Sequence, residues 1–260
     1  MSNAVSEAGT TSVQSVDRAL HILEILGARG ECGVTEIAAE LGIHKSTASR
    51  LMSALLTRNL VEQLSDRGRF RLGRGIVRLA GSVTSNLEGV SGSRAVTRAL
   101  ASETGETVNI AVLDGDSVLY VDQVAGSNLR SLRSWLGQRV PVHCTASGKA
   151  LTAWLDNDAR KAARPTKLER LTEFTITNVD ELERELGQIR ERGWAVANEE
   201  MEEGFMAVGA PIRDAYGEVV AALTVSGPSG RLTKLPLDEL AHKVIASANE
   251  LSGDTDIWRE

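Results

Sequence analysis

The side chains best suited to chemistry in this sequence lie in one short stretch of small polar and basic residues. They are Lys45, Ser46, Thr47, Ser49 and Arg50. Short hydroxyl side chains let a helix backbone approach base edges and phosphates, and an arginine can donate two hydrogen bonds to a guanine. This pattern predicts contact with a DNA duplex. A helical hairpin with a solvated polar face is the alternative explanation of so short a pattern.

Two short helices must position these side chains within residues 35–57. Thr35 can cap the first helix, and Gly42 suits the left-handed conformation that ends a helix. In the second helix Leu51 and Leu55 fall at helical spacing and face inward, which leaves the polar and basic side chains pointing outward. The arrangement predicts a helix-turn-helix whose second helix reads DNA.

The flanking segments extend this motif to a larger domain. A helix is expected over residues 15–26, where apolar residues recur at helical spacing. Residues 60–63 and 69–72 alternate as two strands around a turn at residues 65–68. Three helices followed by a two-stranded hairpin predict a winged helix-turn-helix domain over residues 14–74.

Positive charge is concentrated in the same part of the chain. Residues 44–74 carry seven basic and two acidic side chains, a net charge of +5, so the remainder carries −11 of the total of −6. In the wing, Arg67, Arg69 and Arg71 are expected beside phosphates or the neighbouring minor groove. A small basic face on an acidic body is typical of a DNA-binding head joined to a different module.

The bulk composition indicates a protein of two domains. A chain of 260 residues with 42% hydrophobic content can bury the core of more than one domain. No apolar run approaches the roughly 18 residues of a membrane span, and the polar residues 1–13, expected to be a disordered tail, do not form a signal peptide. We therefore expect a cytoplasmic protein without membrane contact. Cys32 and Cys144 lack CxxC spacing, so we expect no disulfide framework, no metal site and no cofactor.

Residues 75–87 predict a linker helix between the two domains. Ile76, Leu79, Ala80 and Val83 form its apolar stripe. A linker helix with nothing of its own to bury usually buries such a stripe against a partner, and a protein that reads two half-sites is a dimer. We therefore expect a homodimer.

Residues 88–260 predict an α+β domain. Strands are expected at residues 107–113, 117–124, 206–213 and 219–226, and helices at residues 91–103, 145–154, 179–192 and 237–251. The dipeptide Asp114-Gly115 between the first two strands is a strong hairpin signal. Helices interspersed with hairpins predict an antiparallel sheet covered by helices, an architecture that does not itself name a function.

The predicted winged head and three later motifs resemble the IclR family of bacterial transcriptional regulators over about residues 15–253. The motifs are ETVNIAVLDGDSVLYVDQV, PVHCTASGKA and AALTVSGP, in the family's order. The resemblance implies a DNA-binding regulator without catalysis, most often a repressor, that binds promoter DNA as a homodimer or homotetramer. It also implies that residues 88–260 form a GAF-like α/β effector-binding domain for a small metabolite, such as a small organic acid or an aromatic acid.

Carried over from the family by motif, the effector pocket lies between the concave sheet and the start of the TASGK helix. Its candidate residues are Leu129, Leu132, Ala146, Ser147, Pro211, Thr224 and Ser226. Backbone amides at the start of the Ser147 helix can hold a carboxylate, and the hydroxyls of Thr224 and Ser226 can orient it. Trp135 is expected to be a core anchor, and it can alternatively close one wall of the pocket.

Side chains in the same region leave alternative functions open. A cysteine next to a histidine, as Cys144 is to His143, is found in thiolate nucleophiles and redox sensors. A small buried cysteine in a strand-to-helix turn is the simpler interpretation. Ser147 lacks GxSxG context and has no visible His and Asp pair, which argues against a hydrolase. An enzyme or redox sensor that uses Cys144 or Ser147 is therefore the alternative function. The acidic run from Glu199 to Glu203 either binds a metal ion, repels anionic ligands or is a solvated loop.

Overall fold

The structure is a computed structural model that describes residues 13–64, 68–85, 90–127, 134–234 and 236–253. The chain divides into two compact units, Met1–Asn86 and Leu87–Glu260. Each unit has its own hydrophobic core.

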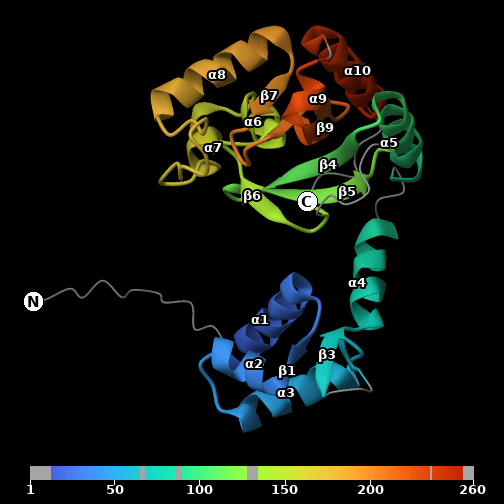
Figure 1. The fold of residues 1–260 in the computed structure, drawn as a ribbon, viewed down its shortest axis with the longest axis vertical. Helices are drawn as coiled ribbons and strands as arrows, with labels where there is room; N and C mark the ends of the chain where they lie inside the picture. The colour runs from blue at the N-terminus through green and yellow to red at the C-terminus, as the bar shows by residue number, and fades with distance from the viewer. Residues whose placement is uncertain (1–12, 65–67, 86–89, 128–133, 235, 254–260) are drawn as a thin grey trace, which may run out of the picture. The chain divides into compact units, whose positions relative to one another are not determined.

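The first unit is a winged helix-turn-helix, as the sequence predicts (Figure 1). Its elements are α1 (Gln14–Arg29), β1 (Cys32–Gly33), α2 (Val34–Glu40), α3 (Lys45–Thr57), β2 (Val61–Gln63), β3 (Arg69–Leu72) and α4 (Arg74–Ser85). The three strands form an antiparallel sheet in the order β1-β3-β2. The pairing of β1 with β3 ties the wing to the segment before α2. A strand of two residues has no alternation that the sequence can reveal.

The core of the first unit fixes how α3 is rotated. Ile22 and Ile37 are fully buried, and Met52 and Leu55 of α3 pack with them. Leu55 therefore faces inward, as predicted. Leu51, which was expected beside it, is only half-buried, because Met52 takes the central position.

The turn between α2 and α3 has the conformation that the sequence predicts, but the cap of α2 differs. Gly42 adopts a left-handed φ of 61°, which ends α2. Thr35 does not cap α2, because the helix already begins at Val34. Instead, the Glu36 carboxylate accepts a hydrogen bond from the backbone N–H of Gly33 at 2.7 Å.

Helix α4 lies where the sequence predicts a linker helix, a role that stays a prediction. Two of its apolar side chains are exposed in the chain by itself, Val77 at 72% and Leu79 at 52%, while Ile76 is half-buried. The side chains of Ala80 and Val83, the other two members of the predicted stripe, lie outside the described part of the structure. The homodimer that this stripe indicates stays a prediction.

The second unit is an α/β domain around one antiparallel sheet (Figure 1). Its helices are α5 (Val90–Thr104), α6 (Ala146–Thr152), α7 (Asn157–Ala162), α8 (Val179–Arg192), α9 (Ser229–Leu232) and α10 (Leu237–Glu250). Its strands are β4 (Thr107–Asp114), β5 (Ser117–Val124), β6 (Arg139–Pro141), β7 (Ala195–Asn198), β8 (Phe205–Arg213) and β9 (Val219–Pro228). The strand order is β6-β5-β4-β9-β8-β7. The long helices and strands were predicted, whereas the short elements β6, β7, α7 and α9 were not.

Alternation along β9 shows how the two faces of this sheet are covered. Leu223 and Val225 are fully buried in a core with side chains of α5 and α10. Ala222 points to the opposite face and packs with residues of α6 and α8. Thr224 and Ser226 alternate in step with Ala222, so their hydroxyls face the α6 side of the sheet. The strands therefore position polar groups beside the start of α6.

Candidate functional site

Helix α3 presents the polar side chains that the sequence singles out. Lys45, Ser46, Ser49 and Arg50 are exposed, whereas Thr47 is half-buried. The helix begins at Lys45. The exposed residues are short or basic and lie on one side of a helix whose other side is core, which is the geometry required for a helix that enters the major groove. We call α3 the recognition helix.

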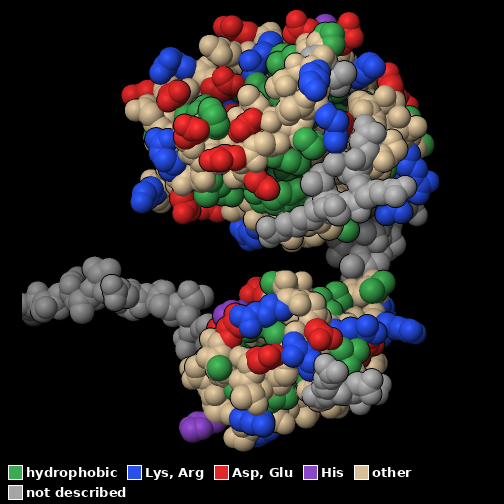
Figure 2. All heavy atoms as spheres, viewed as in Figure 1, with side chains coloured by type: hydrophobic (Ala, Val, Ile, Leu, Met, Phe, Trp, Pro, Cys, Tyr) green, Lys and Arg blue, Asp and Glu red, His purple; other side chains and the backbone are tan. Residues whose placement is uncertain are grey.

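The wing arginines have partners within the first unit, a feature that the sequence did not reveal. Arg69 lies 3.0 Å from a carboxylate oxygen of Glu31 and 3.5 Å from one of Glu36. Arg71 forms an ion pair with Glu62 on the neighbouring strand. Arg67, the third predicted wing contact, lies outside the described residues. Basic side chains are nevertheless spread over the visible face of this unit, including the regions beside α3 and the start of α4 (Figure 2).

Glu36 joins the turn before α2 to the wing. The hydrogen bond from the Gly33 backbone is the main cause that lowers the pKa of Glu36, and the nearby charge of Arg69 lowers it further. The Glu36 carboxylate of α2 therefore stays ionised and faces Arg69 of β3. Arg69 consequently has a structural role in addition to any contact with phosphate.

The second unit contains a small cavity beside the start of α6, which we call the sheet cavity. It is lined by Asn109, Tyr120, Trp135, Cys144, Thr145, Ala146, Ala197, Met201, Phe205, Ala207 and Ser226. Its volume is about 30 Å³, enough for a single water molecule. Aromatic and thioether side chains form much of its wall, and its polar groups are uncharged.

A buried amide faces a hydroxyl in the sheet cavity. Asn109 is 2% exposed, and its Nδ2 donates a hydrogen bond to Ser226 Oγ at 3.1 Å. Asn109 Oδ1 is buried and has no hydrogen-bond partner among the described residues. Buried polar groups are normally satisfied, so this oxygen indicates a position where a water molecule or a ligand donates a hydrogen bond.

A second polar pair lies next to the cavity wall. Tyr120 Oη and Ser147 Oγ are 3.2 Å apart, and Ser147 is fully buried. Burial raises the pKa of Tyr120, so its hydroxyl stays protonated and is available as a donor. Ser147 thus contacts the tyrosine hydroxyl instead of opening directly into the cavity.

The predicted pocket residues divide into three groups. Ala146 and Ser226 line the sheet cavity. Ser147 reaches it through Tyr120, while Thr224 and Pro211 lie on adjoining strands but are not part of the lining. Leu129 and Leu132 lie outside the described residues. The role of all seven as effector contacts stays a prediction.

Most of the cavity wall was not predicted from the sequence. Trp135, expected as a core anchor or alternatively as a wall of the pocket, belongs to the core and also lines the cavity, whereas Asn109, Met201 and Phe205 were missed. Asn109 carries a recognisable signal, because it is a polar residue within the buried run of β4. Met201 lies in the loop between β7 and β8 and Phe205 is the first residue of β8, so their positions depend on the fold and have no pattern in the sequence.

The start of α6 is partly occupied by its own cap. Thr145 Oγ1 accepts a hydrogen bond from the Gly148 backbone N–H at 3.1 Å. Gly148 packs against the Val142 backbone, where a larger residue would collide. The expected carboxylate site at this helix start therefore lacks the Gly148 amide, which already has an intramolecular acceptor.

A buried ion pair holds the loop that contributes Met201. Lys149 Nζ lies 2.6 Å from Glu200 Oε1, and the exposed fractions of these residues are 1% and 8%. Thr175 Oγ1 donates a hydrogen bond to the Glu200 carbonyl at 2.6 Å. The acidic run was expected to be a metal site, to repel anions or to form a solvated loop. None of these descriptions fits Glu200, because its carboxylate is buried against a lysine.

Cys144 and Ser147 lack the surroundings of a nucleophile. Burial is the main cause that raises the pKa of Cys144 to about 12, so the thiol stays protonated near neutral pH. His143 Nε2 contacts the carbonyl oxygen of Glu169 at 3.0 Å. The described hydrogen bond of the Ser147 hydroxyl involves Tyr120. Neither side chain is therefore activated for attack.

In the described ranges, no group of three or more His, Cys, Asp or Glu side chains is placed to hold a metal ion. None of the helices described is both long and apolar enough to cross a membrane.

Comparisons with known proteins give the same description of both units. The family model of the IclR helix-turn-helix domain matches residues 15–65, and that of the bacterial transcriptional regulator IclR C-terminal domain matches residues 81–253. The chain is 31% identical to the transcriptional repressor IclR of Escherichia coli (strain K12), over 94% of this chain and 90% of that protein.

Solved structures resemble the whole chain. The crystal structure of the Thermotoga maritima IclR protein covers 92% of this chain and 97% of its own, with 32% identity and a TM-score of 0.75. An IclR homologue from Microbacterium hydrocarbonoxydans, solved in complex with 4-hydroxybenzoate, covers 92% of this chain and 97% of its own. That likeness, with 21% identity and a TM-score of 0.78, concerns the fold alone.

Proposed function

The chain belongs to the IclR family of bacterial transcriptional regulators, and we propose that a small metabolite bound in its second unit controls DNA binding by its first. Membership makes it a regulator with a helix-turn-helix DNA-binding domain, not an enzyme. We assign DNA binding to residues 14–74, the connection to residues 75–87, and effector binding and oligomerisation to residues 88–260. The proposed DNA contacts are Lys45, Ser46, Thr47, Ser49, Arg50, Arg67, Arg69 and Arg71.

The unpaired Oδ1 of Asn109 is the observation that carries the effector proposal. Asn109 lies in the wall of the sheet cavity, hydrogen-bonded to Ser226, and the aromatic rings of Tyr120 and Trp135 line the same cavity. Apolar walls with a few convergent polar groups are characteristic of small-molecule sites. The amide of Asn109 can rotate, so it can meet either a donor or an acceptor on a ligand.

The lining of the cavity favours an aromatic acid or another small organic acid with an apolar body. None of the lining residues is charged, and the nearest buried cation, Lys149, is already paired with Glu200. The acid group would therefore meet neutral donors, among them the hydroxyls of Tyr120 and Ser226. 4-Hydroxybenzoate, the ligand of the Microbacterium hydrocarbonoxydans homologue, is the first compound to test.

A cavity of about 30 Å³ cannot hold such a ligand without a change in its wall. Met201 and Phe205 are suited to move, because Met201 lies in the loop between β7 and β8, Phe205 directly follows that loop, and methionine adapts readily to new shapes. A ligand that fits only the opened cavity stabilises the opened conformation. The coupling to DNA binding equals the difference in ligand affinity between the two conformations.

The assembly on DNA follows from the exposed apolar side chains of α4. We propose that Val77 and Leu79 pack against a second copy, which gives a homodimer or a tetramer of two dimers. Two heads would then read two half-sites of promoter DNA in the bacterial cytoplasm. The repressor relative in Escherichia coli supports repression as the direction of control.

The experiment that tests the proposal has two stages. Sheared genomic DNA from the source organism is selected on the purified protein and sequenced, which supplies an operator. Operator affinity is then measured with and without 4-hydroxybenzoate and a panel of small organic acids, while tryptophan fluorescence is followed. We expect one acid to quench Trp135 saturably and to change operator affinity. An acid that changes operator affinity equally in the wild type and in Asn109→Ala would refute the assignment of the sheet cavity.

A further inference from the structure

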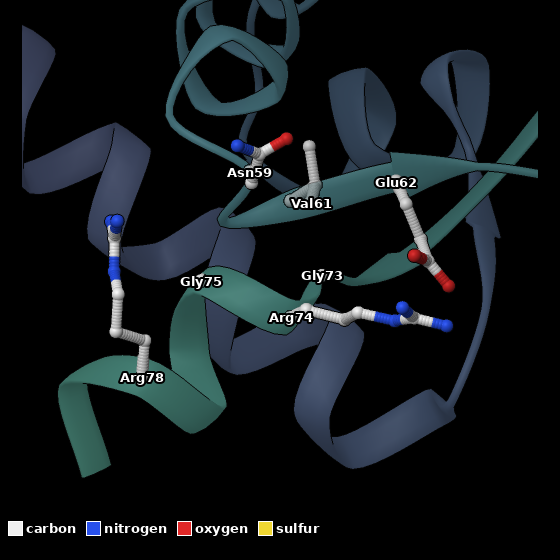
Figure 3. A pocket seen from close by; sticks show the side chains of 7 residues that line it. All are labelled: Asn59, Val61, Glu62, Gly73, Arg74, Gly75 and Arg78. Atoms are coloured by element: carbon white, nitrogen blue, oxygen red, sulfur yellow. The ribbon is translucent and has the colours of Figure 1, made fainter. Parts of the chain in front are cut away.

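A hollow in the first unit lies where the end of the recognition helix, the wing and α4 meet. Figure 3 shows that Asn59 and Glu62 border it on one side and that Arg74 and Arg78 rise from α4 on the other. We call it the arginine hollow. Its volume is about 320 Å³, roughly ten times the space of a water molecule.

Two glycines keep the floor of the arginine hollow bare. Gly75 donates its backbone N–H to the carbonyl oxygen of Asn59 at 2.8 Å, and Gly73 donates to the carbonyl of Leu60 at 2.8 Å. A Cβ atom at Gly73 or Gly75 would collide with the Asn59 backbone. Asn59 itself has a positive φ of 56°. This close backbone packing holds the start of α4 against the segment that follows α3.

The charge of the hollow is positive. Arg74 and Arg78 are exposed and lie one helical turn apart, and neither has an ion pair within the described residues. Their guanidinium groups reach toward opposite ends of the hollow (Figure 3). The Glu62 carboxylate is already paired with Arg71. Each arginine fork can donate two parallel hydrogen bonds to a phosphate group.

The position of the hollow relative to the recognition helix indicates the source of that phosphate. The first residues of such a helix contact bases, and the major groove is about 12 Å wide. A helix of 13 residues is about 20 Å long, so when its first residues lie in the groove the segment after its end would lie beside the sugar-phosphate backbone. Asn59 follows α3 by two residues and borders the hollow.

We propose that Arg74 and Arg78 each bind a phosphate of the DNA backbone, at opposite ends of the arginine hollow. The contacts rest on the DNA binding proposed above and add a site beyond the recognition helix and the wing. They fix the orientation of the head on the duplex and carry no sequence information. The free energy of these contacts comes largely from the counterions that the phosphates release, so they weaken as salt rises.

The test measures the affinity of the full-length protein for the selected operator and for a scrambled duplex, between about 50 and 200 mM salt. Arg74→Ala and Arg78→Ala should each lower the affinity for both duplexes by the same factor, about 5-fold near 0.15 M salt. Each should also reduce the slope of log affinity against log salt by about 1. The double variant should lose about 2 in slope, because the two arginines contact separate phosphates.

Two control variants separate this contact from a general charge effect. Lys167→Ala removes the same charge from an exposed position in the second unit and should leave affinity and slope unchanged. Arg78→Lys keeps the charge and should retain most of the slope. Thermal unfolding followed by circular dichroism verifies that each variant is folded.

Three outcomes would overturn the proposal: unchanged slopes, a loss confined to the operator, or an equal loss in Lys167→Ala. A separate calorimetric titration measures the binding of inorganic phosphate to the DNA-free protein. If both arginine variants abolish this binding but leave the salt dependence of DNA binding unchanged, the hollow binds a free phosphate and the DNA contact is overturned. If the wild type binds neither duplex, the proposed DNA-binding function is itself contradicted, and the arginine contact with it.

Discussion

Lys149 and Glu200 are joined by a buried ion pair that fastens α6 to the loop after β7. The Nζ atom lies 2.6 Å from Glu200 Oε1 and donates a second hydrogen bond to the carbonyl oxygen of Val196 at 3.1 Å. The same loop supplies Met201 to the sheet cavity, and α6 supplies Ala146. The pair therefore fixes the distance between two walls of the proposed effector site.

Removal of one partner should destabilise the second unit strongly. Lys149→Met leaves the Glu200 carboxylate buried without a counterion, and Glu200→Gln leaves the ammonium group in the same position. Each should lower the free energy of unfolding by about 3 to 5 kcal/mol. Urea unfolding followed by circular dichroism measures the change.

The double variant Lys149→Met with Glu200→Gln is the matched control for this pair. Because it leaves no buried charge, it should recover most of the stability lost by either single change. A stability loss in the double variant equal to the sum of the two single losses would show that Lys149 and Glu200 are not energetically coupled.

The hydroxyl of Ser226 should affect effector affinity while that of Thr224 should not. Ser226→Ala removes the partner of the Asn109 amide in the cavity wall and should weaken quenching of Trp135 by the effector, by about 5-fold or more for one lost hydrogen bond. Thr224→Val removes a hydroxyl from the same strand outside the lining and preserves volume. Equal effects of the two changes would show that the ligand lies elsewhere on the sheet.

Long elements could be predicted from the sequence because their periodicity is repeated. Helix α8 matches its predicted range, and Gly42 has the predicted left-handed conformation, because each depends on local chemistry. The strands β6 and β7 are too short, at three and four residues, to show alternation. They form because the sheet offers them a neighbouring strand.

The candidate sites were predictable only where one helix or motif carries the function. The exposed face of α3 needs no knowledge of the fold. By contrast, the partners of Arg69 are more than 30 residues away in sequence, and Glu200 is paired with a lysine 51 residues before it. Contacts of this kind depend on tertiary structure, and no pattern in a single sequence contains them.

His143 should make the stability of the second unit depend on pH. Burial, aided by the charge of Lys149, lowers its pKa below the ordinary 6.5, so the folded state binds fewer protons than the unfolded state. Its contribution to stability is present above about pH 6.5 and is lost as pH falls below that value. The free energy of unfolding should therefore fall between about pH 7.5 and 5.5, and less so in His143→Gln.

The measurement for His143 is urea unfolding of the wild type and His143→Gln at matched pH values. The difference between the two proteins isolates the imidazole from other titrating groups. A difference that is constant across the pH range would contradict a buried neutral histidine.

Cys144 should resist alkylation in the folded protein. Since burial raises its pKa to about 12, the thiolate is scarce even at about pH 9, where an exposed cysteine reacts readily. Treatment with iodoacetamide and peptide mapping by mass spectrometry should detect modified Cys144 in urea and little of it in the native protein. Rapid native labelling would revive the redox alternative.

Arg50 and Arg69 should differ in their effects on DNA binding. Arg50 is exposed on the recognition helix, so Arg50→Ala should weaken operator binding by about 1 to 3 kcal/mol and scrambled DNA less. Arg69→Ala should lower the affinity for both duplexes equally. It should also lower the thermal stability of the first unit, because Arg69 is paired with Glu31 and Glu36. Loss of specificity in Arg69→Ala alone would show that these roles are reversed.

The most direct test of the central claim is the affinity of the full-length protein for its selected operator, with and without a saturating acid that quenches Trp135. The account predicts that the acid changes operator affinity at least about 5-fold, the lower end of typical coupling between sites. It also predicts that Ser226→Ala shifts the acid concentration required. Equal operator affinity with and without the bound acid would contradict control of the head by the sheet cavity.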